Sequence, residues 1–258
     1  SSTFSHPQLG DTTGYQYTRE SNPTRDRLEQ LIAGLEEGTD ALAFSSGMAA
    51  VDAVFHLFSP GDHIILGDDL YGGSIRMFTN IYEQNGIEFT YVGTSDLDAV
   101  KAAFRPNTKA VYIETPTNPM MEITDIRALC ALAHERNALV IIDNTFLSPY
   151  FQKPLTLGAD IVVHSGTKFI GGHHDVISGF TIVKDDELAA KLRLTYKTVG
   201  ACLSAMDSWL VIRGVKTLAL RMEQHQKNAI ALAEWLKKQP KVTKVLFHTK
   251  CQCFDAAD

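Results

Sequence analysis

The sequence predicts an α/β domain with a mainly parallel seven-stranded sheet that helices cover on both faces. Short runs rich in Val, Ile and Leu alternate with segments of helical period, and this alternation is typical of parallel sheets. The chain has 258 residues and is 45% hydrophobic, which is enough for a sizeable buried core. The predicted strands span residues 41–44, 63–66, 88–92, 110–114, 139–143, 161–164 and 179–183.

Helical segments lie between most of these strands. Thr124 and Asp125 provide side chains that can cap the last of four predicted helices. These helices span residues 47–58, 74–84, 96–104 and 124–136. Residues 205–239 then predict a long helix with a break near Gly214, and Pro240 ends it. The β-branched pattern of residues 242–247 predicts a new strand.

The change of pattern divides the chain into three parts. We expect an N-terminal arm over residues 1–18, a large domain over 19–218, and the beginning of a small α/β C-terminal domain over 219–258. The tail 251–258 fits no element.

Composition and charge exclude several classes of protein. The net charge of −6 without a basic run argues against a nucleic-acid partner. Apolar runs such as 138–142 are too short to cross a membrane. The four cysteines are too few and too scattered for a disulfide scaffold, and the first residues are polar, so we expect a cytoplasmic protein.

Two motifs after predicted strands indicate covalent cofactor chemistry. Ser165-Gly166-Thr167-Lys168 follows an apolar strand, where small hydroxyl residues can hold a phosphate while the lysine reacts with an aldehyde. Asp143 ends another apolar strand, and a carboxylate there needs a cation, such as the pyridinium nitrogen of pyridoxal phosphate (PLP). Taken singly, Lys168 also fits a solvated loop, and Asp143 also fits a helix cap.

Four further segments carry polar or aromatic groups that suit the same cofactor. Ser46-Gly47-Met48 opens a helix, whose free amides bind phosphate. Tyr71 lies in a turn where its ring can stack on a planar cofactor. Asn118 lies in a rigid Pro-rich turn, and Arg19 follows Tyr17 near the start of the chain, where a guanidinium can pair with phosphate.

Together these motifs resemble the cystathionine γ-synthase/γ-lyase/β-lyase family of PLP enzymes, which have the fold type I of PLP-dependent transferases. The matching motifs, in order, are Tyr-x-Tyr-x-Arg with Asn-Pro-Thr, Ser-Ser-Gly-Met-Ala-Ala, Leu-Tyr-Gly-Gly, Glu-Thr-Pro-Thr-Asn-Pro, Asp-Asn-Thr-Phe and Ser-Gly-Thr-Lys-Phe-Ile-Gly-Gly-His. The resemblance runs from the first residues to about Val245 and implies PLP as the cofactor.

The resemblance also implies a role for each residue. Lys168 forms the Schiff base and, with Tyr71, carries the catalysis. Asp143 pairs with the ring nitrogen, Tyr71 stacks on the ring, and Asn118 lies near the cofactor oxygen. The phosphate is held by Gly47, Met48, Ser165 and Thr167, and by Tyr17 and Arg19 of a neighbouring subunit. A homodimer or homotetramer with shared active sites follows.

The implied reaction is the cleavage of cystathionine or a related thioether amino acid by β- or γ-elimination. The alternatives are a γ-synthase, which exchanges the γ-substituent of an activated homoserine, and a catalytically incomplete PLP-binding fragment. The family has a segment before Ser1 and a C-terminal domain after Val245, so we expect an incomplete chain. His174 stands where the family has a small polar residue.

Two interpretations outside this family fit the sequence less well. A dehydrogenase-type binding domain would need a glycine fingerprint that the chain lacks. A metal site at His164, His173, His174 and Asp175 is unnecessary, because one cofactor explains the same region.

Overall fold

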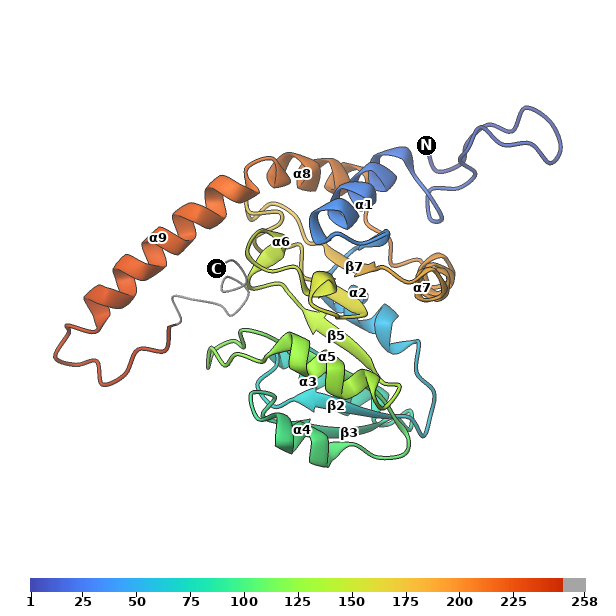
Figure 1. Cartoon of the computed structure of the whole chain (residues 1–258). Coiled ribbons are helices and arrows are strands. Elements are labelled where there is room, and N and C mark those ends of the chain that lie inside the picture. The colour runs from blue at the N-terminus through green and yellow to red at the C-terminus, as the bar shows by residue number, and fades with distance from the viewer. Residues whose placement is uncertain (248–258) are drawn as a thin grey trace.

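The computed structural model describes residues 1–247 and is built on a seven-stranded sheet (Figure 1). The strand order is β1-β7-β6-β5-β4-β2-β3. Strand β7 is antiparallel to both of its neighbours, and the other pairs are parallel. The strands are β1 (Asp40–Phe44), β2 (His63–Gly67), β3 (Glu88–Val92), β4 (Thr108–Glu114), β5 (Leu139–Asp143), β6 (Ile161–His164) and β7 (Gly179–Val183). The predicted fold class is confirmed.

One face of the sheet is covered by α2 (Gly47–Phe55), α3 (Gly72–Met77) with the π-helical turn Phe78–Tyr82, and α7 (Asp186–Val199). The centre of this layer is aromatic. The rings of Phe55 and Phe78 stack with centroids 4.3 Å apart, and both contact the ring of Tyr112 on β4. These side chains are almost completely buried, so the layer holds the sheet through apolar area removed from water.

Two pairs of helices cover the opposite face. Helices α1 (Pro23–Glu36) and α8 (Ala205–Val215) pack on the β1–β7 side, and α4 (Leu97–Ala103) and α5 (Ile126–His134) pack on the β2–β5 side. Short helices α6 (Ser148–Phe151) and η2 (Pro154–Thr156) connect β5 to β6. The cap of α5 is Asp125, whose carboxylate accepts from the Ala128 amide at 3.1 Å. Thr124 instead bonds to Thr94.

The long C-terminal helix is broken where the sequence predicts. Helix α8 ends at Val215, and α9 (Leu218–Leu236) continues in a new direction. Residues 242–247 form no strand, so that prediction is wrong. A strand is stable only beside a hydrogen-bonding neighbour, and the described part of the chain offers these residues none. The predicted tail 251–258 lies outside the described residues.

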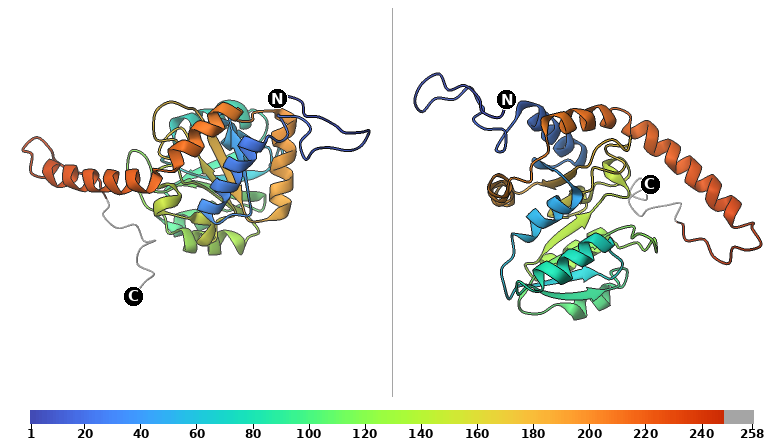
Figure 2. Two further views of the ribbon diagram at one scale, coloured as in Figure 1. Left: turned by 90° about the horizontal axis from the view of Figure 1, so that it is seen from above. Right: turned by 180° about the vertical axis from the view of Figure 1, so that it is seen from behind.

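Two segments extend away from the sheet on opposite sides. The N-terminal arm, residues 1–18, and helix α9 both project from the body (Figures 1 and 2). Within residues 1–247, no helix has the length and apolar character needed to cross a bilayer.

Candidate active site

A cavity of about 590 Å³ lies at the carboxyl ends of the parallel strands. Loops after β1, β2, β4, β5 and β6 line it, as expected for a ligand site in an open α/β sheet. Its volume is in the range of small-molecule and cofactor sites. Eight of the ten predicted site residues line it, namely Gly47, Met48, Tyr71, Asn118, Asp143, Ser165, Thr167 and Lys168.

One end of the cavity is suited to an anion. Helix α2 begins there, and in the described part of the chain the side chain of its cap, Ser46, bonds only to the Ala49 amide, at 3.1 Å. The amides of Gly47 and Met48 therefore remain available in the first turn. A Cβ on Gly47 would lie 2.8 Å from the Cβ of Ser165, so only glycine lets this turn approach the Ser165 loop so closely.

Lys168 lies in a tight turn directly after β6. Its amide donates to the Ser165 carbonyl at 3.2 Å, and its carbonyl accepts from the Gly172 amide at 2.8 Å. Within residues 1–247 the Nζ atom has no hydrogen bond or ion pair, so the amine is free to react. Thr167 is less free, because its hydroxyl bonds to the Ser178 carbonyl at 3.2 Å and accepts from the Ser178 amide at 3.0 Å.

Two carboxyl groups lie at the base of the cavity. Asp143 accepts from the Thr145 amide at 3.0 Å, and Glu114 accepts from the Tyr71 amide at 3.1 Å. Burial, followed by repulsion from Asp143, raises the pKa of Glu114. Burial also raises the pKa of Asp143. The hydrogen bonds that Asp143 accepts from Thr145 oppose this shift, as does electrostatic attraction to the nearby His164. An arriving cation would stabilise the pair most in its fully ionised state.

Tyr71 projects over the mouth of the cavity with 53% of its surface exposed. Its ring lies directly against Gly73, where an added Cβ would be 2.4 Å from the ring carbon Cε1. Any side chain at position 73 must therefore displace the ring. Asn118 lines the cavity from the β4 loop, which a bond from the Met120 amide to Asp69 ties to the Tyr71 loop.

Tyr17 and Arg19 do not line the cavity of their own chain. Arg19 donates to the Lys197 carbonyl at 2.8 Å, and its guanidinium lies 5.3 Å from the centroid of the Tyr17 ring. Their predicted role in a neighbouring subunit's site therefore stays a prediction.

The sequence did not reveal several residues of the cavity wall. Phe169 contacts both Phe146 and His225, with ring centroids 6.4 and 5.5 Å away, so an aromatic row runs to helix α9. Phe146 and Phe169 could have been found, because each lies within three residues of a predicted site residue. His225 lies far along the chain, and no local signal marks it.

Arg221, in the first turn of α9, clamps the loop that carries Lys168. Its guanidinium donates to the carbonyls of Phe169 at 2.6 Å and Gly214 at 2.9 Å, with a longer bond to Ile170 at 3.4 Å. The backbones also touch, since a Cβ on Gly214 would lie 2.1 Å from the Gly171 carbonyl oxygen. The α8–α9 junction thus packs directly against the loop that carries Lys168.

His164 lies near Asp143 but does not line the cavity. It is fully buried and bonds to Glu36 at 2.6 Å, and Asn144 donates to the same carboxylate at 2.9 Å. Within residues 1–247, no three His, Cys, Asp or Glu side chains converge as metal ligands do.

The residues at the cavity fit PLP. The amides at the start of α2 and the Ser165 hydroxyl suit its phosphate, and the Lys168 amine, which has no partner among residues 1–247, suits its aldehyde. The two acids have no cationic partner within hydrogen-bonding distance in the described chain, which suits its pyridinium nitrogen.

Comparison with known proteins agrees with this chemistry. The family model described as "Cys/Met metabolism PLP-dependent enzyme" matches residues 1–255. A cystathionine gamma-lyase of Bacillus subtilis (strain 168) is 51% identical over 93% of this chain and 64% of its own length. A cystathionine beta-lyase of Lactococcus lactis subsp. cremoris (strain MG1363) is 49% identical over 95% of this chain and 65% of its own length.

A solved structure has the same fold. The cystathionine gamma synthase from Xanthomonas oryzae pv. oryzae, in complex with aminoacrylate and cysteine, superposes with a TM-score of 0.93. It is 40% identical over 96% of this chain and 64% of that chain. This chain thus spans less than two thirds of the length of these relatives. By its matched residues, its identity to these relatives and its fold, the chain belongs to the family of Cys/Met metabolism PLP-dependent enzymes.

Proposed function

We propose that this chain forms the cofactor-binding part of a PLP-dependent carbon–sulfur lyase that cleaves cystathionine or a related thioether amino acid by β- or γ-elimination. The observation that carries the proposal is the shared cavity of Lys168 and Asp143, a buried acid and an amine without a partner among the described residues. Relatives named as cystathionine gamma-lyase and beta-lyase support the choice of substrate.

When bound, PLP supplies an electron sink for the charge that develops at the substrate Cα. Lys168 Nζ would hold the cofactor and then take the Cα proton. Asp143 would accept a hydrogen bond from the ring nitrogen and keep it protonated. The Tyr71 ring would stack on the cofactor, and its hydroxyl would assist proton transfer at Cβ. Gly47, Met48, Ser165 and Thr167 would hold the phosphate, and Asn118 would lie near the ring oxygen.

The active unit in this proposal is a homodimer at least, and a homotetramer as a pair of dimers. Tyr17 and Arg19 complete the phosphate site of the neighbouring chain, which agrees with their absence from the lining of the cavity in their own chain. Residues 19–218 act as the PLP-binding domain, and residues from 219 onward begin the C-terminal domain. We place the protein in the cytoplasm, where cysteines such as the free Cys130 and Cys202 stay reduced.

The second candidate is γ-replacement, as in a cystathionine γ-synthase. The solved structure with a TM-score of 0.93 carries that name, which supports this candidate. An inactive PLP-binding fragment is the remaining alternative.

Product analysis separates these reactions. The PLP-loaded protein is given cystathionine, and the keto acid is identified, with Lys168→Ala as the control. Pyruvate indicates β-elimination, and 2-oxobutyrate with cysteine indicates γ-elimination. If neither keto acid forms but cysteine and an activated homoserine yield cystathionine, the γ-synthase alternative holds. No turnover of either kind would overturn the proposed activity.

A further inference from the structure

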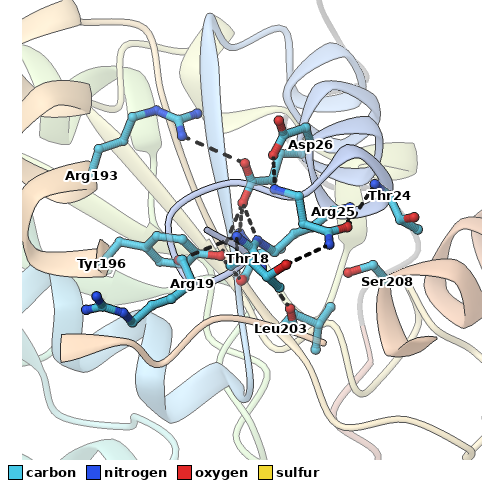
Figure 3. Close-up of polar contacts among 12 residues, drawn as sticks. Thr18, Arg19, Thr24, Arg25, Asp26, Arg193, Tyr196, Leu203 and Ser208 are labelled. Carbon is cyan, nitrogen blue, oxygen red and sulfur yellow. Dashed lines mark hydrogen bonds and ion pairs between the residues drawn. The ribbon is translucent and has the colours of Figure 1, made fainter. Parts of the chain in front are cut away.

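Arg25 is a completely buried cation at the base of the N-terminal arm. Its guanidinium donates mainly to backbone carbonyls, with Nη2 2.6 Å from the Thr18 oxygen and 3.5 Å from the Arg19 oxygen (Figure 3). Nη1 donates to the Leu203 carbonyl at 3.3 Å. One side chain therefore joins the end of the arm to α1 and to the segment before α8.

Side chains of α1 and α7 hold the Arg25 guanidinium in place. Its Nε lies 3.8 Å from the Glu29 carboxylate, one turn along α1, and the Tyr196 ring of α7 lies 5.6 Å from the guanidinium carbon. Glu29 is itself fixed, because it accepts from the Ala43 amide of β1 at 3.0 Å. A guanidinium held by helix, strand and aromatic ring has little freedom, so its hydrogen bonds fix the backbone that they reach.

The backbone that Arg25 fixes carries the two residues with no place in their own cavity. Tyr17 is 43% exposed, and Arg19 runs along the surface beside Gly200, where a Cβ would lie 3.0 Å from the Arg19 Cδ. Beyond them the arm leaves the body of the molecule (Figure 2). Arg25 thus holds the carbonyl oxygens of Thr18 and Arg19, which lie between and beside the two residues that the arm presents.

We infer that Arg25 is a positioning residue that acts on the cofactor site of the neighbouring chain, by fixing the direction in which the arm presents Tyr17 and Arg19. The inference rests on the proposed sharing of sites between subunits. Without the hydrogen bonds from Arg25, binding PLP must also order the freed backbone of Thr18 and Arg19. Ordering one or two residues costs roughly 10- to 100-fold in affinity.

The first test measures PLP retention in the PLP-loaded protein. Arg25→Met is compared with Arg27→Met, on the same helix, whose side chain bonds within residues 1–247 only to Gln30, at 3.4 Å on the surface. Borohydride reduction followed by peptide mass analysis gives the fraction of Lys168 that carries the cofactor as PLP is titrated. We expect a 10- to 100-fold weaker PLP midpoint for Arg25→Met, faster proteolysis within residues 1–18, and parent-like behaviour for Arg27→Met. A parent-like midpoint for Arg25→Met would overturn the inference.

Mixed dimers separate an effect on the neighbour from an effect within the same chain. An Arg25→Met chain is combined with a Lys168→Ala chain, and the heterodimer is isolated by two different tags. The one site that has Lys168 then receives its arm from the chain with an intact Arg25. Recovery of the parent PLP midpoint at Lys168 supports the inference, and a midpoint as weak as in the Arg25→Met homodimer overturns it.

A parallel mixture of Arg19→Ala with Lys168→Ala tests the sharing itself. Recovery there without recovery for Arg25→Met overturns only the role of Arg25, whereas no recovery in either mixture overturns the shared site. If circular dichroism shows that Arg25→Met does not fold, Arg25→Lys replaces it in both experiments. The lysine keeps the buried charge but cannot reach several carbonyls at once. A parent-like PLP midpoint for Arg25→Lys would then overturn the inference.

Discussion

Replacing Arg221 by methionine should loosen the loop that presents Lys168 to the cofactor. The change removes two charge-assisted bonds to carbonyls of this loop, Phe169 at 2.6 Å and Ile170 at 3.4 Å, and keeps much of the apolar stem. Such bonds contribute ~1.5–3 kcal/mol each when buried. Because the guanidinium is only partly buried, we halve that sum to ~1.5–3 kcal/mol. If PLP binding must restore the lost order, its dissociation constant rises about 10- to 150-fold.

The assay is a PLP titration of the apoprotein that follows visible absorbance and borohydride labelling of Lys168. Arg213→Met is the matched control, since Arg213 is a nearby arginine whose guanidinium stacks on Trp209, outside the cavity. The control should bind PLP as the parent does. Equal PLP affinity in the Arg221→Met and Arg213→Met proteins would refute the view that Arg221 positions the lysine loop. An equal loss of PLP affinity in both variants, with unchanged visible spectra, would refute the same view.

Three more outcomes are expected. Asp143→Ala should fold normally but lower the elimination rate and alter the visible spectrum of bound PLP, since the ring nitrogen loses its counter-charge; an unchanged rate and spectrum would contradict this role. Gly214→Ala places a Cβ 2.1 Å from the Gly171 oxygen and should lower stability by ~1–3 kcal/mol and weaken Lys168 labelling, as thermal unfolding and labelling can check. Burial raises the pKa of Glu29 from 4.5 to about 7, so its stabilising contribution is complete below pH 4.5 and lost as the pH rises through 7. Urea unfolding of Glu29→Gln should therefore lack a decline of about 3 kcal/mol that the parent shows across this range, and identical pH profiles would disprove it.

The strands and the cavity were predictable because their signals are local. Buried parallel strands consist of consecutive apolar residues, and Asp143 and Lys168 stand directly at or just after such runs. The strand at 242–247 was wrong because a β-branched pattern cannot reveal whether a neighbouring strand exists. The contacts of Arg221 and His225 could not be predicted, since both depend on the angle at which α9 leaves the body.

The bonds from Arg221 to the lysine loop could not be predicted for the same reason. Nothing near Arg221 in the sequence shows that it also bonds to the carbonyls of Phe169 and Ile170, some 50 residues earlier. Likewise, the burial of Arg25 depends on three separate segments meeting at the end of the arm. Side chains that bond to distant backbone leave no periodic pattern, so only the folded arrangement reveals them.

Because Arg221 lies in the first turn of α9, a tilt of this helix moves Arg221 much less than it moves the far end. The helix has 19 residues and is thus about 28 Å long, and Arg221 lies only about 4.5 Å along it from the first residue, Leu218. A tilt of about 10° around that first residue would carry the far end through about 5 Å but move the Arg221 backbone by less than about 1 Å. Displacements at the tip therefore reach the Lys168 loop strongly reduced where Arg221 holds it, so these hydrogen bonds change little when the outer turns of α9 move.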